Sequence, residues 1–154
     1  MTKRLIILIT ILLGLTAFTV NAQMHKNVQW RMTIKLTSAT EGVATLKAII
    51  DDGYHMYGTK PVKGGPIATV IDFNKSCGVK LIGEPVSTPA PSAGIDALFG
   101  IKLSWWSGIV TFKQKFKVTD RAKARINCDI KYQTCDKNRC SMPVSETLSK
   151  TLPK

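Results

Sequence analysis

The sequence predicts an all-β protein, a sandwich of two packed sheets, and three observations lead to this fold class. Apolar and polar residues alternate with a period of two over much of the chain, as they do in half-buried strands. Glycine, proline, asparagine and aspartate separate the alternating segments, which is typical of turns between strands. No segment after residue 22 has the spacing of a convincing amphipathic helix. About eight short strands with turns between them favour two antiparallel sheets around one core.

The predicted strands cover most of the chain after the N-terminal segment. A DDG sequence at residues 51–53 is predicted to form the turn that connects the second strand to the third. Residues 85–94 are predicted to be a long loop, because the prolines there cannot donate hydrogen bonds within a central strand. In chain order the strands are predicted at residues 28–37, 44–50, 54–57, 67–73, 79–83, 110–118, 125–135 and 144–152.

The N-terminus has the features of a signal peptide. Two basic residues precede an apolar run over residues 5–20, and a small-residue cleavage pattern ends at Ala22. An uncleaved anchor is the alternative, but the run is short for a bilayer span and no cysteine at its end could accept a lipid. Residues 1–22 are therefore predicted to be a signal peptide, with no stable membrane anchor after cleavage, and residues 23–154 to be one domain.

The chain is strongly basic. It has 22 basic and 10 acidic residues, and loss of the two basic residues of the signal peptide leaves a net charge of +10. Nucleic acid is not an expected partner for an exported protein. The lysines recur mainly on the polar faces of strands, which is typical of a solvated surface. An acidic protein partner or an anionic envelope surface is the alternative interpretation.

The four cysteines form an even set in a chain predicted to be exported, where disulfides persist. Cys128 shares the apolar face of its strand and is predicted to point inward. Cys135 lies on the opposite face at the strand end and is predicted to point toward solvent. Turn-forming residues 136–138 and then Cys140 follow it, so Cys135 and Cys140 flank a tight turn within disulfide range.

Spacing alone leaves two interpretations of this pair open, a redox switch and a structural bridge. Loop-closure entropy gives roughly 2 kcal/mol for a ring between Cys135 and Cys140, against roughly 4 for one between Cys77 and Cys128. The short ring is the weaker structural cross-link, and a partner thiolate could reach it without disturbing the core. Three cations nearby favour a thiolate on either cysteine, namely Lys131, Lys137 and Arg139.

Other cysteine and metal chemistries fit the sequence less well. The chain has no C-x-x-C motif, so the thioredoxin signature is absent. Four-cysteine zinc sites usually contain two closely spaced pairs, which Cys77 and Cys128 do not form. The adjacent His55 and Met56 suggest copper, together with Met24, His25 and Met142. Singly scattered histidines and methionines are, however, more typical of core or surface. No metal or other cofactor is expected.

Three motifs along the chain resemble one known family. They are DGYHMY at residues 52–57, LFG at residues 98–100 with the WWSG and TFKQKFKV stretches behind it, and YQTC at residues 132–135 through Cys140 to Pro143. Together they resemble the N-terminal periplasmic domain of DsbD-type thiol:disulfide interchange proteins, the disulphide bond corrector domain. The cysteine motif is the most specific of the three.

The resemblance implies a periplasmic protein with an immunoglobulin-like β-sandwich. It implies that Cys135 and Cys140 accept electrons from a thioredoxin-like or DsbD-type membrane donor. They would pass these electrons to periplasmic oxidoreductases or cytochrome c maturation factors. The chain is expected to be the carrier alone, so its donor would be a separate protein. The family pattern does not settle which cysteine forms the mixed disulfide with a partner.

The resemblance also implies a cap loop that shields the cysteines, matched here by residues 96–100 with Asp96, Leu98 and Phe99. Leu98 occupies the position of the family's capping aromatic residue, which is a departure from the pattern, and Phe99 follows it. Simple core packing of the two is the alternative. Tyr54 and Tyr57 are expected to line the site, or else to be core or cross-strand residues.

A second departure is Ser141-Met142-Pro143, where the family commonly has a Pro-Pro step. Cys77 and Cys128 lie outside the family motif, and a structural bridge between them is preferred to two free thiols. Two other functions compete with the redox carrier. One is a non-catalytic immunoglobulin-like binding module whose disulfides are structural, and the other is a metal-handling protein.

Overall fold

The computed structural model describes residues 26–153, so the predicted signal peptide lies outside the described residues. None of the described residues forms a helix long and apolar enough to cross a membrane. The described part of the chain is all-β and has eleven strands, which in order are β1 (Val28–Leu36), β2 (Glu41–Ile50), β3 (His55–Tyr57), β4 (Val70–Asp72), β5 (Val79–Thr88), β6 (Ser92–Ile95), β7 (Lys102–Trp106), β8 (Ile109–Val118), β9 (Arg125–Tyr132), β10 (Thr134–Cys135) and β11 (Val144–Thr151).

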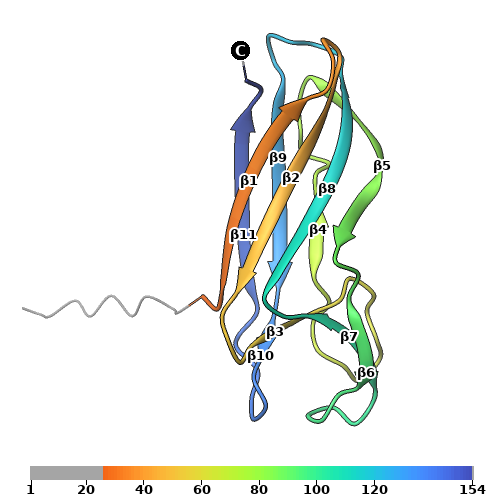
Figure 1. The fold of residues 1–154 in the computed structure, drawn as a ribbon, viewed down its shortest axis with the longest axis vertical. Coiled ribbons are helices and arrows are strands. Elements are labelled where there is room, and N and C mark those ends of the chain that lie inside the picture. Colours follow the sequence, from red (N-terminus) through yellow and green to blue (C-terminus); the bar gives the residue numbers. More distant parts are fainter. Residues whose placement is uncertain (1–25, 154) are drawn as a thin grey trace, which may run out of the picture.

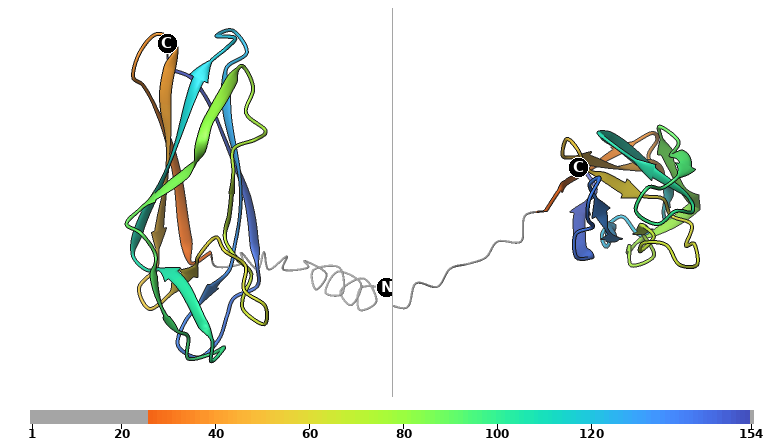
Figure 2. Two further views of the ribbon diagram at one scale, coloured as in Figure 1. Left: turned by 90° about the vertical axis from the view of Figure 1, so that its right-hand side faces the viewer. Right: turned by 90° about the horizontal axis from the view of Figure 1, so that it is seen from below.

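Two layers run along the length of the molecule (Figure 1). One is a four-stranded sheet in the order β1-β2-β8-β5, and the other is a three-stranded sheet in the order β11-β9-β4. All neighbouring strands in these sheets are antiparallel. Figure 2 shows the two layers facing each other across the core. The predicted fold class, an immunoglobulin-like β-sandwich, is confirmed.

The core follows from the alternation in the sequence. Every second residue of β2 from Gly42 to Ile50 is buried, and so is every second residue of β9 from Ile126 to Tyr132. These inward faces meet in one cluster with the aromatic rings of Phe112 and Trp106, whose centroids lie 5.2 Å apart. Burial of apolar side chains at about 25 cal/mol per Å² is the main stabilisation of such a sandwich.

A third sheet closes one end of the sandwich and builds the site. It is short, in the order β10-β3-β7-β6, and it lies at the lower end of the molecule in Figure 1. β3 is its centre, because Met56 pairs with Thr134 of β10 on one side and with Trp106 of β7 on the other. Met56 itself is buried in the main core. The short sheet is therefore rooted in the sandwich.

The structure corrects the predicted loop at residues 85–94. Most of it is strand, because β5 continues to Thr88 and β6 begins at Ser92. Pro85 is tolerated because β5 is an edge strand whose pairing with β8 is irregular between Ile82 and Val86. The buried Gln114 amide donates hydrogen bonds to carbonyls in this irregular stretch. β7 was not predicted, and the strand predicted at residues 67–73 is limited to β4.

Candidate redox site

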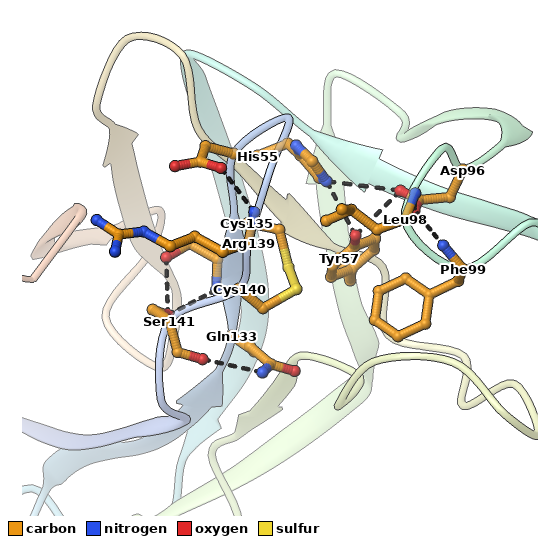
Figure 3. The surroundings of a disulfide bond; sticks show 12 residues. His55, Tyr57, Asp96, Leu98, Phe99, Gln133, Cys135, Arg139, Cys140 and Ser141 are labelled. Carbon is orange, nitrogen blue, oxygen red and sulfur yellow. Dashed lines mark hydrogen bonds and ion pairs between the residues drawn. A yellow bond between two sulfur atoms is a disulfide. The ribbon is translucent and has the colours of Figure 1, made fainter.

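A disulfide joins Cys135 and Cys140, with their Cα atoms 3.9 Å apart (Figure 3). Cys135 ends β10, and the two cysteines form an isolated antiparallel bridge across the turn. The Asp136 carboxylate builds this turn by accepting hydrogen bonds from the backbone N–H groups of Asn138 and Arg139, at 2.7 and 2.8 Å. These bonds hold the pKa of Asp136 below its usual value. The predicted tight turn therefore brings the cysteines together.

The segment after Cys140 is tied back to the sheet without help from the disulfide. The backbone N–H of Ser141 donates to the Thr134 carbonyl at 2.8 Å, and the Gln133 amide donates to the Ser141 carbonyl at 2.9 Å. The buried Thr134 hydroxyl accepts from the Asn27 amide at 3.0 Å. Opening the sulfur–sulfur bond would leave these hydrogen bonds in place. The arrangement can hold two thiols close together in the reduced state.

The prediction that Cys135 points toward solvent is wrong. Its exposed fraction is 0%, whereas Cys140 is half-buried. The alternation of buried residues continues to Thr134 and breaks at Cys135, because the chain leaves the three-stranded sheet after Tyr132 and joins the short sheet through β10. Cys135 then packs in a small cluster with Tyr57 and Leu103. A partner can therefore approach the disulfide more easily through Cys140.

An open pocket of about 420 Å³ lies on the Cys140 side of the disulfide. It is lined by Asn27, Tyr54, Arg139, Cys140 and Ser141. Tyr54 thus lies beside the cysteines as expected, and it also packs partly against the main core. Arg139 contributes the only basic side chain in the lining of this pocket, where a positive charge would favour a nearby thiolate.

Asp96 organises the loop over residues 96–100. Its carboxylate accepts hydrogen bonds from the backbone N–H groups of Leu98 and Phe99, at 2.9 and 3.1 Å, and from the Tyr57 hydroxyl at 3.0 Å. Asp96 is only 6% exposed, so these partners replace the water that a buried carboxylate would lose. The backbone N–H of Gly100 closes the loop on the Asp96 carbonyl at 2.8 Å. One carboxylate therefore links the loop to β3.

Phe99 packs against the cysteine cluster of Tyr57, Leu103 and Cys135. The Phe99 ring meets the Tyr57 ring edge to face, with centroids 5.9 Å apart, and belongs to the same cluster as Cys135 and Cys140. Leu98 is 37% exposed. The loop thus contributes an aromatic side chain to this cluster one residue after the position expected from the family pattern, and Leu98 and Phe99 both lie in the surroundings of the disulfide (Figure 3). The packing of Phe99 fits the expected shielding of the pair.

Sequence reasoning considered His55 only as a weak copper ligand, yet it lies in this site. His55 pairs with Cys135 in the register of β3 with β10. Its Nε2 atom lies 3.0 Å from the Tyr57 hydroxyl oxygen and 3.7 Å from an Asp96 carboxylate oxygen. The signal was available, because residues 55 and 57 of one strand share a face and Tyr57 was already expected there.

The hydrogen bonds of Tyr57 define the tautomer of neutral His55. Tyr57 has one hydroxyl proton and donates it to Asp96, so its oxygen must accept the proton of His55 Nε2. Burial lowers the pKa of His55, and the negative charges of Asp96 and Asp136 oppose part of that shift. Burial, aided by the hydrogen bond to Asp96, raises the pKa of Tyr57. His55 and Tyr57 are therefore both neutral near pH 7, and they lead by hydrogen bonds to the Asp96 carboxylate.

The predicted bridge between Cys77 and Cys128 is absent, and both are free thiols. Cys77 pairs with Arg125 across an isolated bridge, which places it three residues from Cys128 along β9. That offset corresponds to roughly 10 Å and to the opposite face of the strand, beyond disulfide range. Cys77 is exposed, and Cys128 is buried between the sheets, where burial raises its pKa to about 12.

No group of three or more metal-ligating His, Cys, Asp or Glu side chains occurs in residues 26–153. Of the residues considered for copper, Met56 is fully buried in the main core, and Met142 is 72% exposed on the surface. His55 is engaged with Tyr57.

Solved structures similar to this fold include N-terminal domains of ScsB and DsbD proteins. The N-terminal periplasmic domain of ScsB from Proteus mirabilis is 23% identical, with a TM-score of 0.58 over 81% of this chain. The chain spans only 46% of that ScsB chain. The reduced DsbD N-terminal domain of Neisseria meningitidis is 18% identical, with a TM-score of 0.49 over 81% of this chain and 86% of that one.

A complex between the DsbD and PilB N-terminal domains from Neisseria meningitidis gives 16% identity and a TM-score of 0.48, over 78% of this chain and 80% of that one. No curated protein sequence matches the chain. The family described as thiol:disulfide interchange protein DsbD, N-terminal, matches residues 19–152, which is nearly the whole chain. The chain therefore belongs to the family of DsbD N-terminal domains.

Proposed function

We propose that this chain is a periplasmic thiol-disulfide exchange module that carries electrons through Cys135 and Cys140. The observation that carries the proposal is the position of this disulfide, outside the main core in a turn that its own hydrogen bonds maintain. A ring this small stabilises the fold by only roughly 2 kcal/mol, so its opening is compatible with an intact sandwich. Family membership supports the same chemistry.

The exchange is expected to begin at Cys140. A donor thiolate attacks Cys140 Sγ, the bond to Cys135 breaks, and Cys135 leaves as a thiolate that takes up a proton. The donor's second thiol then attacks the donor sulfur of the mixed disulfide and releases Cys140, so two electrons and two protons reach the carrier. In the second half, Cys140 attacks an acceptor disulfide and Cys135 resolves the new mixed disulfide. The half-burial of Cys140 and the pocket beside it favour this order.

The proposed donor is a thioredoxin-like or DsbD-type membrane protein. The proposed acceptors are periplasmic oxidoreductases or cytochrome c maturation factors. The structure of the Neisseria DsbD domain with a PilB domain is one precedent for pairing between such domains. The predicted signal peptide agrees with a periplasmic location.

The decisive measurement is the reduction potential of the pair, in a Cys77→Ala, Cys128→Ala background that leaves one disulfide. A potential above about −300 mV, in the range of exchange-active pairs, is the expected result. A lower potential would instead favour the alternative function, a binding module in which this disulfide is structural.

Single-cysteine variants, made in the same Cys77→Ala, Cys128→Ala background, test the order of attack. Cys135→Ser keeps Cys140 and is expected to form a stable mixed disulfide with a thioredoxin-like partner that has been activated at its own cysteine. Cys140→Ser keeps only the buried Cys135 and is expected to trap little of the same partner. Equal trapping by the two variants would contradict the proposed order, although it would leave the redox function standing.

A further inference from the structure

One outer face of the sandwich carries a concentration of positive charge. On the strands of the β1-β2-β8-β5 sheet, seven basic side chains point away from the core. Glu41 is the acidic residue in register with them, and Glu84 is exposed in the irregular stretch of β5. We call this surface the basic face, and it consists of Arg31, Lys35, Lys47, Lys80, Lys113, Lys115 and Lys117.

The register of the sheet places like charges directly opposite each other. Arg31 of β1 pairs with Lys47 of β2, and Lys80 of β5 pairs with Lys117 of β8, which has Glu41 of β2 on its other side. Directly opposed like charges destabilise a sheet, so the stability of the fold does not account for this arrangement. No ion pair joins any residue of the basic face to a carboxylate within the described part of the chain. An external anion would relieve the repulsion.

The opposite outer face of the sandwich has no such excess. There, Asp72 and Asp129 lie among the outward residues of β4 and β9, beside Lys131. Lys75 forms an ion pair with Asp129 at 2.5 Å, which lowers the pKa of Asp129. Asp72 and Asp129 are direct cross-strand partners there, and the ion pair with Lys75 relieves their repulsion. The concentration of positive charge is a property of one sheet and does not simply follow from the basic composition.

The basic face lies along the flank of the molecule, away from the disulfide. The row nearest the redox end consists of Gln29, Ile49 and Ile109 and carries no charge. The basic residues begin in the next outward row, which contains Arg31, and continue to Lys117 at the far end of the sheet. A protein that docks on Cys140 therefore need not cover this face (Figure 1).

The chemistry of the basic face suits a lipid surface better than a protein partner. The basic face measures roughly 20 Å along the strands and roughly 15 Å across them. Its area is well below the roughly 800 Å² that each partner of a stable protein interface contributes. No aromatic side chain lies on this face of the four strands, and six of its seven cations are lysine. Protein interfaces are enriched in aromatic residues and arginine and depleted in lysine.

We infer that the basic face binds the anionic headgroups of a phospholipid bilayer and holds the carrier by its flank, with the disulfide end free for exchange. Clusters of four to eight lysines and arginines are typical of such electrostatic attachment. Two exposed aliphatic side chains, Ile82 and Val86, lie in the rows of Lys115 and Lys113, but the outward rows have no aromatic residue. Attachment is therefore expected to be mainly electrostatic and reversible by salt. The inference does not depend on the redox chemistry of the cysteines.

Cosedimentation with vesicles tests the inference. The probe is vesicles of phosphatidylglycerol mixed with phosphatidylcholine, with pure phosphatidylcholine as the neutral reference, and the protein is the chain from Gln23 onward, which contains every described strand. The face variant is Lys113→Gln, Lys115→Gln, Lys117→Gln. The matched control is Lys60→Gln, Lys63→Gln, Lys131→Gln, which removes the same charge from exposed positions outside the basic face.

The expected result is binding to anionic vesicles at low salt, little binding to neutral vesicles, and release as salt rises. Each lysine near an anionic surface contributes roughly fivefold in affinity, so the face variant is expected to bind at least tenfold more weakly than the control variant. Equal weakening of both variants would overturn the inference, because total charge would then suffice. Absence of binding to anionic vesicles would also overturn it. A face variant that slowed exchange with a soluble acidic partner, without vesicle binding, would assign the face to that partner instead.

Discussion

His55 and Cys135 are direct cross-strand partners in the pairing of β3 with β10. This register places an imidazole next to the buried sulfur of the disulfide, and it couples that position to Tyr57 and Asp96 through hydrogen bonds. The redox pair is thus enclosed by groups from three separate segments of the chain.

The oxidised protein should lose stability as the pH falls below the ordinary pKa of histidine, about 6.5. Because burial lowers the pKa of His55 in the folded state, the unfolded state binds more protons between the two pKa values. The stability that neutral His55 maintains is complete above pH 6.5 and is lost as the pH falls toward the lower, folded-state pKa. His55→Phe should remove this part of the pH dependence. Urea unfolding at pH 7.5, 6.5 and 5.5 measures the effect, and parallel curves for the two proteins would contradict it.

Removal of the Phe99 ring should expose the disulfide. Phe99→Ala takes away the ring that packs on Tyr57 beside the cysteines, and reduction by a small thiol should become several-fold faster. Because Phe99 is only partly buried, the free energy of unfolding should fall by about 1 to 2 kcal/mol, less than for a fully buried phenylalanine. Leu98→Ala, at a more exposed position of the same loop, is the matched control and should change the rate less. An equal effect of both variants would place the shield on Leu98.

Loss of the Asp96 carboxylate should loosen the whole loop. Asp96→Ala leaves the N–H groups of Leu98 and Phe99 and the Tyr57 hydroxyl without their acceptor, and unfolding should become easier by about 2 to 4 kcal/mol. Asp96→Asn keeps one acceptor oxygen and should cost less. Chemical denaturation compares the two variants. If both lost the same stability, the negative charge rather than the hydrogen bonds would hold the loop.

Alkylation should distinguish the two free thiols. Native protein treated with iodoacetamide at pH 8 should be modified at the exposed Cys77 and protected at Cys128, because burial both shields Cys128 and raises its pKa to about 12. Cys128→Ala should lower the free energy of unfolding by about 1 kcal/mol, since it removes one atom from a packed core. Mass mapping measures the modification. Rapid modification of Cys128 would show that the sandwich opens locally around β9.

Alternation along the chain was sufficient to predict the long strands and the inward faces of β2, β8 and β9. In an alternating strand, only the apolar set of residues can form the buried face, so residues such as Ile126 and Cys128 were assigned correctly. The turn residues after Cys135 were likewise sufficient to predict the disulfide with Cys140, because that geometry is local. Both predictions depend only on residues that are close together in the sequence.

Alternation failed where a strand changes sheets or lies at an edge. Cys135 was predicted to be exposed, because nothing in the local pattern shows that β10 leaves the sheet of β9 after Tyr132. The strand character of β5 around Pro85 was missed for a similar reason, since only the tertiary position at an edge makes a proline acceptable. Long-range pairing decided these points.

By itself, the sequence determined the all-β sandwich, its core faces and the close pair of cysteines. Only the tertiary structure decided that His55 faces Cys135, that Phe99 packs against the cysteine cluster, and that Cys77 and Cys128 remain apart. The physical reason is the range of the interactions. Periodicity and turns act over a few residues, whereas the register between strands distant in sequence fixes which side chains meet.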